Sequence, residues 1–104
     1  MRLLANELRI LRMMYDKGYR YIARSGDAFG REMLTFFENE PKMQTLDNGN
    51  VWWENDTGQH NRIQNPAFDS DIFQFVKINH LPIEINALLD ASLVKDTFVQ
   101  KVGA

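Results

Sequence analysis

The sequence contains no cysteine among its 104 residues. Disulfide bonds, zinc sites built from thiolates and thiol nucleophiles are therefore excluded. Because small secreted domains often depend on disulfides, this absence favours a reducing compartment, and we expect a cytoplasmic protein. The sequence also lacks an apolar run long enough to cross a bilayer, and polar residues interrupt its apolar N-terminal stretch, which argues against a signal peptide.

Recognisable catalytic and cofactor motifs are also missing. The two histidines, His60 and His80, belong to no metal-binding spacing, and no serine lies in a nucleophile elbow. Gly26 and Gly30 form no phosphate-binding loop, since the bulky Phe29 and an acidic residue lie between them. We therefore predict a protein that is not an enzyme and that holds no metal and no cofactor.

The composition is ordinary for a globular protein. Hydrophobic residues make up 44% of the chain and charged residues 25%, which argues against global disorder. Aromatic residues make up 12%, and their large side chains can supply much of a small core. We expect a single domain over residues 1–104, which is long enough to fold on an apolar core of its own.

The net charge of −2 is unevenly distributed along the chain. Residues 1–31 carry seven basic and three acidic side chains, whereas residues 32–104 carry five basic and eleven acidic ones. Either the two parts meet in the fold and neutralise each other, or the basic part forms an interaction surface. The first interpretation is the more usual one.

The hydrophobic pattern predicts an α+β fold with an N-terminal helix, a small antiparallel sheet of about four strands and a C-terminal helix. Apolar residues at helical spacing predict an amphipathic helix over residues 2–16, which Gly18 would end. The Asn48-Gly49 pair predicts a hairpin turn, and the polar stretch 55–71 predicts a long loop. The predicted strands cover residues 19–24, 32–38, 51–54 and 72–78.

The C-terminal part of the sequence allows two alternatives. In the first, Ile83 and Ile85 alternate as in a strand, and Asn86 caps a helix that follows. In the second, Pro82 is the first residue of one continuous helix. We expect residues 99–104 to form a loose tail.

Trp52 and Trp53 are the strongest functional signal in the sequence. Neighbouring residues of a strand point to opposite faces of the sheet. If the sheet is covered on one side only, one indole is buried and the other is accessible, where it can anchor a protein partner or stack on a base. In the alternative interpretation both indoles are buried, the outer one under the loop 55–71.

A second candidate surface combines Tyr21 with Arg20 and Arg24 on the first predicted strand. Aromatic and cationic side chains on a sheet are the ingredients of a platform for single-stranded nucleic acid, to which Arg31 would add a further charge. By strand parity, however, Tyr21 lies on the face opposite to Arg20 and Arg24. The acidic balance of residues 32–104 would also repel phosphate.

The segment DKGYRYIAR, residues 16–24, resembles the opening of short uncharacterised phage and prophage proteins of low-GC Gram-positive bacteria, in which a KGYRYIARD strand follows a helix. The resemblance covers roughly residues 15–90. The sequence departs from the pattern at Ile78, where tryptophan is usual, and in its longer 55–71 loop. The other matching pieces occur in the same order: Phe36-Phe37 with Pro41, Trp52-Trp53, residues 72–78, and Pro82 with Ile85, Leu88 and Leu89.

The resemblance implies an accessory protein of a phage or prophage in the cytoplasm of a bacterial host, and it implies no activity. Our leading hypothesis is a non-enzymatic protein-binding module that acts on a partner, such as a host enzyme that it inhibits, or on a second copy of itself. The alternative hypothesis is a module that binds single-stranded nucleic acid. The candidate binding residues are Trp52, Trp53, Arg20, Arg24 and Tyr21.

Overall fold

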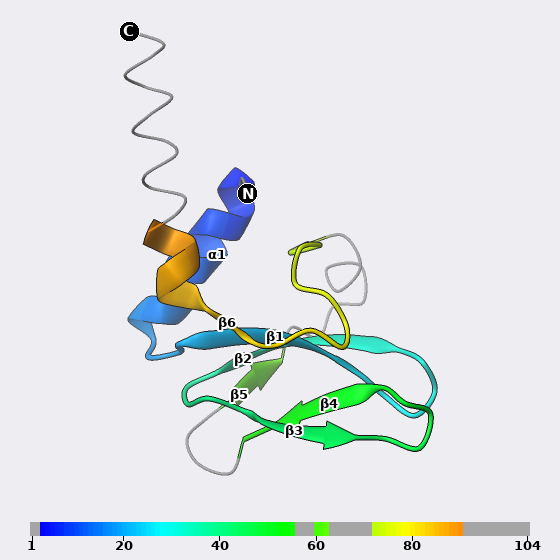
Figure 1. The fold of residues 1–104 in the computed structure, drawn as a ribbon. Coiled ribbons are helices and arrows are strands. Elements are labelled where there is room, and N and C mark those ends of the chain that lie inside the picture. The colour runs from blue at the N-terminus through cyan, green and yellow to red at the C-terminus, as the bar shows by residue number, and fades with distance from the viewer. Residues whose placement is uncertain (1–2, 56–59, 63–71, 91–104) are drawn as a thin grey trace, which may run out of the picture.

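The computed structural model describes residues 3–55, 60–62 and 72–90, and it confirms the predicted α+β fold (Figure 1). No helix among these residues is long and apolar enough to cross a membrane. In chain order the elements are α1 (Ala5–Asp16), β1 (Tyr21–Gly26), β2 (Glu32–Phe37), β3 (Lys42–Thr45), β4 (Val51–Glu54), β5 (His60–Arg62), β6 (Ile83–Glu84) and a helical segment at 85–90.

Four strands form one antiparallel sheet in the order β5-β2-β1-β6. The central pair places Ile22 opposite Phe36, and β6 pairs only with the first two residues of β1. Strands β3 and β4 form a separate two-stranded hairpin. The β1–β2 pair therefore lies at the centre of the fold, as its apolar side chains on both faces require.

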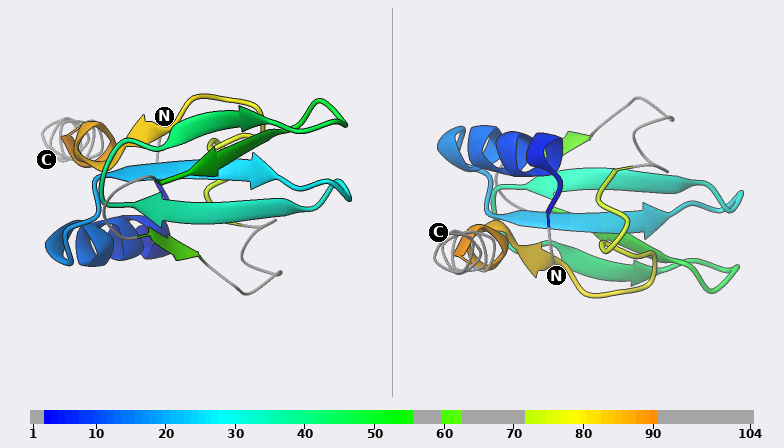
Figure 2. Two further views of the ribbon diagram at one scale, coloured as in Figure 1. Left: turned by 90° about the horizontal axis from the view of Figure 1, so that it is seen from below. Right: turned by 90° about the horizontal axis from the view of Figure 1, so that it is seen from above.

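The two faces of the four-stranded sheet are covered by different elements, as the two views of Figure 2 show. On one face, Ile22 packs with Leu11 of α1 and with Phe73, in a cluster that also includes the segment 72–76 and the helix at 85–90. On the other face, Ala23 packs against Trp53 of the hairpin. Alternating residues of β1 thus serve two separate clusters, which follows from the period of two along a strand.

Side chains rather than strand ladders attach the β3–β4 hairpin to the rest of the molecule. The backbone N of Trp53 donates to Oγ of Ser25 at 2.9 Å, and that of Val51 donates to Oδ1 of Asn79 at 2.8 Å. Because alternate N–H groups of β4 point away from β3, these two acceptors satisfy donors that the hairpin cannot pair itself.

Most of the N-terminal half follows the sequence prediction. Helix α1 ends before Gly18, whose φ of 104° is the left-handed conformation that glycine adopts without strain. The second and third predicted strands correspond to β2 and β4, and the Asn48-Gly49 turn joins β4 to β3. The first strand begins and ends two residues later than predicted, because Tyr19 and Arg20 belong to the connection that precedes β1. Strand β3 was not predicted.

Three predictions for the second half are wrong or incomplete. Residues 72–78 form turns instead of a strand, with Phe73 at φ 54°. Within the predicted loop 55–71, residues 60–62 form a strand, and most of its remaining residues lie outside the described part of the chain. For residues 82–90 the structure supports a strand followed by a helix, but the helix begins at Ile85, so Asn86 is not its cap. The predicted tail lies outside the described residues.

Candidate functional site

Strand β4 buries Trp53 and leaves Trp52 half-buried on the opposite face. Trp53 is 7% exposed and packs against Ala23 and Phe37. Of the two alternatives that the sequence allowed, the structure fits the one in which a single indole packs inward, and Trp53 is that residue. Trp53 is therefore a core residue and offers no accessible ring to a partner.

The polar group of the Trp53 indole is buried without a partner among the described residues, which is unusual in a folded protein. Its Nε1 is buried and has no hydrogen-bond partner in the described structure. A buried donor without an acceptor costs about 1–3 kcal/mol relative to one that is paired. The burial of the large ring against Phe37 offsets this cost, so Trp53 stabilises the fold through its apolar area rather than through its N–H.

Arg24 lies inside the fold instead of on an accessible platform. Its side chain is 4% exposed, and its guanidinium donates to three backbone carbonyls of the 72–76 segment. Nε contacts the carbonyl oxygen of Val76 at 2.6 Å, and Nη2 contacts those of Ile72 at 3.0 Å and Phe73 at 3.2 Å. The guanidinium of Arg24 thus has a structural role in holding the 72–76 segment, and only 4% of the residue is exposed.

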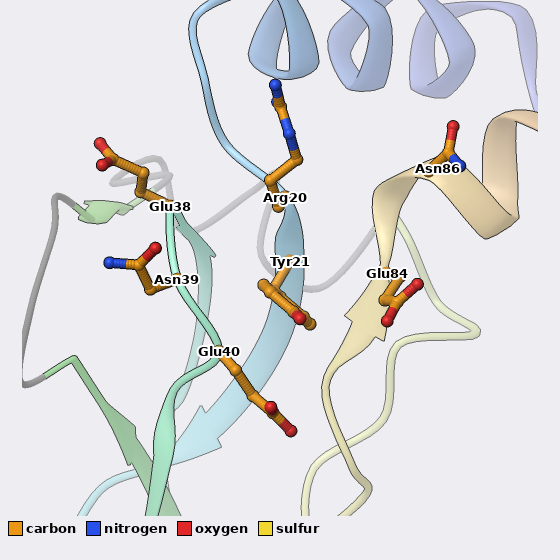
Figure 3. Close-up of a pocket in the computed structure, with 7 residues that line it drawn as sticks. All are labelled: Arg20, Tyr21, Glu38, Asn39, Glu40, Glu84 and Asn86. Atoms are coloured by element: carbon orange, nitrogen blue, oxygen red, sulfur yellow. The ribbon is translucent and has the colours of Figure 1, made fainter.

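Arg20 is exposed but is held against helix α1. Its guanidinium lies over the ring of Tyr15, 4.0 Å from the centroid, and Nη1 donates to the carbonyl oxygens of Tyr15 and Tyr19 at 2.8 and 2.9 Å. The cation is therefore directed away from the sheet surface on which Tyr21 lies, as the stick view shows (Figure 3).

Arg20 and Tyr21 do line a common pocket of about 340 Å³ at the start of β1. Three carboxylates line it, and Figure 3 shows Glu84 to one side of Tyr21 and Glu40 below it. This acidic lining is the reverse of what a phosphate backbone needs. The remaining lining residues are Glu38, Asn39 and Asn86.

None of the described acidic or histidine side chains forms a group of three that could hold a metal ion. His80 is exposed in the turn that precedes β6, where it lines a second pocket of about 290 Å³. That pocket lies between the start of β2 and the segment 74–80, and the buried Arg24 contributes to it.

Among the described residues, Phe29 is the most exposed of the large apolar ones, with 84% of its surface accessible. It lies at the tip of the β1–β2 hairpin, in the segment 27–31, which we call the Phe29 turn. One carboxylate holds this turn: Oδ1 of Asp27 accepts the backbone N–H groups of Phe29 and Arg31, both at 2.8 Å. Oδ2 of Asp27 accepts Nε of Arg31, also at 2.8 Å.

The neighbouring hairpin braces the Phe29 turn. The Nδ2 atoms of Asn48 and Asn50 both donate to the backbone carbonyl of Asp27, at 3.0 and 3.2 Å. The β1–β2 and β3–β4 turns consequently lie together at one end of the molecule (Figure 1). Arg31 adds a contact inside the turn, with its guanidinium 5.5 Å from the centroid of the Phe29 ring.

The electrostatics of the turn follow from the hydrogen bonds of Asp27. Desolvation raises the pKa of this carboxyl group, but the N–H groups of Arg31 and Phe29 and the positive charge of Arg31 outweigh it. The pKa of Asp27 therefore lies below its ordinary value. The carboxylate is ionised at neutral pH, which is the form that holds the turn.

Sequence reasoning missed Phe29 as a functional candidate and used it only to exclude phosphate binding. The available signal was an aspartate two residues before an aromatic residue, with a glycine after it, which is a pattern typical of a side-chain-stabilised turn with an exposed apex.

Comparisons of the chain with family models, curated proteins and solved structures find no match. The resemblance to phage and prophage proteins stays a prediction.

Proposed function

We propose that this chain is a non-enzymatic protein-binding domain that inserts Phe29 into an apolar pocket of a partner protein. The observation that carries the proposal is the exposure of 84% of Phe29 on a turn held by several hydrogen bonds. Aromatic side chains dominate the energetics of protein interfaces when they enter a fully desolvated pocket. Here the aromatic side chain projects from the end of the molecule and lies outside both core clusters.

Preorganisation supports a binding role for the turn. An ordinary loop loses conformational entropy when a partner fixes it, and this loss weakens association. The carboxylate of Asp27 and the amide of Asn48 already fix the backbone on either side of Phe29. The backbone part of this entropy loss therefore occurs when the protein folds, before any partner binds.

The charges around the turn favour a protein partner over a membrane. Arg31 is neutralised within the turn by Asp27, while the exposed Glu32 and Asp47 lie in or beside the two hairpin turns. Anionic lipid would be repelled by these two carboxylates, and inserting them together with Phe29 into a bilayer would cost desolvation energy. A partner pocket with a neutral or basic rim avoids both penalties.

The nucleic-acid alternative has less support. Arg24 lies in the interior, as does Trp53, one of the two tryptophans that this hypothesis could use, and Tyr21 lines an acidic pocket. We therefore keep protein binding as the proposed function. A phage or prophage protein that inhibits a host enzyme remains one form that this function can take.

The proposal is tested by comparing the wild type with Phe29→Ser and with a matched control, Leu81→Ser. Leu81 is 77% exposed and lies in the connection that precedes β6, so the control removes a similar apolar area elsewhere. Each tagged protein is used to capture partners from cells that carry the gene, and each is sedimented alone to measure self-association. Thermal unfolding checks that all three proteins have equal stability.

The expected result is a specific protein, or a second copy of the chain, that the wild type and Leu81→Ser bind equally and Phe29→Ser does not bind. Reconstitution with the purified partner then gives the affinity of each variant. If Phe29→Ser binds every partner as tightly as the wild type does, Phe29 is not an anchor and the proposal is rejected.

A further inference from the structure

The link between the two hairpin turns depends on a chemically labile residue. Asn48 is exposed and is followed by Gly49, which has no Cβ to hinder approach to its backbone nitrogen. An asparagine side chain in this position can be attacked at Cγ by the next backbone nitrogen. We propose that Asn48 is a site of spontaneous deamidation, and that this modification uncouples the β3–β4 turn from the Phe29 turn.

The reaction needs only water. The backbone nitrogen of Gly49 loses its proton to solvent and forms a bond to Cγ of Asn48. The bond from Cγ to Nδ2 breaks, and the nitrogen leaves as ammonia after taking up a proton from solvent. Water then opens the resulting cyclic imide at either carbonyl, which gives aspartate or isoaspartate at position 48, with no oxidation or reduction in any step.

The folded turn restrains this reaction without preventing it. Nδ2 of Asn48 donates to the carbonyl of Asp27 at 3.0 Å, and its Oδ1 accepts the backbone N–H of Asn50 at 3.0 Å. The N–H of Gly49 donates to the carbonyl of Leu46 at 2.9 Å. Attack requires Gly49 to leave Leu46 and the amide of Asn48 to rotate, so the rate depends on how often this exposed turn opens.

The product cannot make the link that Asn48 makes. A carboxylate has no proton to donate, so the contact with the carbonyl oxygen of Asp27 is lost and becomes repulsive. Isoaspartate also adds one atom to the main chain and disrupts the pairing of Leu46 with Asn50. Of the two hydrogen bonds described between these turns, the one from Nδ2 of Asn50, at 3.2 Å, would remain.

The effect of deamidation on partner binding rests on the proposed function, because the loosened turn is the one that presents Phe29. The deamidation itself does not. The chemistry and the coupling can both be measured without a partner. A failure of the deamidation proposal is therefore distinguishable from a failure of the proposed function, which depends on the comparison of Phe29→Ser with Leu81→Ser.

The first measurement follows deamidation in the folded protein at mildly alkaline pH by peptide mass spectrometry. Asn39 and Asn50 serve as internal references, since each is followed by a residue with a bulky side chain. We expect Asn48 to be modified before both, to give both aspartate and isoaspartate, and to react faster still in urea. If Asn48 is modified no faster than Asn39 or Asn50, the proposal is overturned.

The second measurement uses Asn48→Asp as a mimic of one product and Asn39→Asp as a control with the same change of charge away from the turn. Amide hydrogen exchange is followed at Phe29 and Arg31, whose N–H groups donate to Asp27. Loss of one hydrogen bond predicts exchange about 2- to 10-fold faster in Asn48→Asp. Exchange equal to that of the wild type, or an equal change in Asn39→Asp, would show that the turns are not coupled through Asn48.

Discussion

Glu7 and Arg24 hold the same residue, Phe73, by opposite ends of its backbone. Oε2 of Glu7 accepts the N–H of Phe73 at 2.6 Å, and Nη2 of Arg24 donates to its carbonyl at 3.2 Å. Both charged side chains are 4% exposed. Phe73 has a φ of 54°, which is rare for a large side chain, so these contacts offset a conformation that is otherwise unfavourable.

We predict that Arg24→Met destabilises the fold by about 3 kcal/mol, because three buried carbonyls would lose their donor. Methionine replaces the aliphatic stem of arginine and lacks only the guanidinium, so the loss reports mainly the removal of that group. Urea unfolding followed by circular dichroism measures the change. A loss below about 1 kcal/mol would mean that the 72–76 segment finds other donors.

Glu7→Gln provides a milder test of the same arrangement. Oε1 of Glu7 also accepts the N–H of Leu4 at 2.8 Å, so the carboxylate satisfies two backbone donors at once. The amide of glutamine keeps one acceptor oxygen, and we expect a loss of roughly 1–2 kcal/mol. Stability equal to the wild type would show that the second donor does not depend on Glu7.

The segment 72–78 also shows why part of the fold could not be predicted from the sequence. Its alternating apolar residues satisfy the pattern of a strand, yet Ile72, Phe73 and Val76 all reach the core from turns. What decides between the two structures is Arg24, 48 to 52 positions earlier in the chain, which takes the carbonyls that a sheet ladder would use. No local pattern contains that information.

The candidate site shows a similar division. Local chemistry was sufficient for the hairpin turn at Asn48-Gly49. For the two adjacent tryptophans it left two alternatives open, and it did not indicate that Trp53 is the buried one. It was not sufficient for Phe29, because exposure depends on what the rest of the chain leaves uncovered. It also misplaced Arg24, whose charge would ordinarily indicate the surface.

Two substitutions of Trp53 separate the stability that comes from ring packing from the cost of burying the unpaired Nε1–H. Trp53→Ala removes the ring that packs on Ala23 and Phe37, and we expect a loss of about 3–5 kcal/mol. Trp53→Phe keeps an aromatic ring and removes the unpaired Nε1–H, so its cost is expected to be about 1 kcal/mol or less. Calorimetric unfolding of both variants measures the difference. Equal losses would indicate that a phenyl ring does not replace the packing of the indole on Ala23 and Phe37.

Gly26 leaves little room for a side chain at the end of β1. A Cβ at this position would lie 2.5 Å from Cδ1 of Ile78 and 2.8 Å from Cγ of Asn50. Gly26→Ala is therefore expected to cost about 1–3 kcal/mol through overpacking. The added methyl group should also push the amide of Asn50 away from the carbonyl of Asp27. We therefore expect faster amide exchange at the Phe29 turn together with the loss of stability.

Gly30→Ala provides the control for Gly26→Ala. A Cβ at Gly30 would meet no atom within 4 Å, but the φ of 81° is unfavourable for alanine. We expect a loss of about 1 kcal/mol from backbone strain alone. If Gly26→Ala costs no more than Gly30→Ala, the side chains of Ile78 and Asn50 move aside without loss.

The pH dependence of the Phe29 turn follows from Asp27. The pKa of Asp27 in the folded protein lies below its ordinary value of 3.8. A carboxyl group with a lowered pKa stabilises the folded turn above the ordinary value, and this contribution is lost as the pH falls through the lowered pKa. We therefore expect the turn to stay ordered at mildly acidic pH and to loosen only below about pH 3.8.

Nuclear magnetic resonance can follow this transition through the amide protons of Phe29 and Arg31, which donate to Oδ1 of Asp27. Their chemical shifts should change with the protonation of Asp27, while circular dichroism reports whether the rest of the fold persists. In Asp27→Asn the group does not ionise, so the same amides should show no such transition and should exchange faster at neutral pH. An Asp27 that titrates at or above 3.8 would mean that its hydrogen bonds do not favour the ionised form, and that the turn is not held by charge.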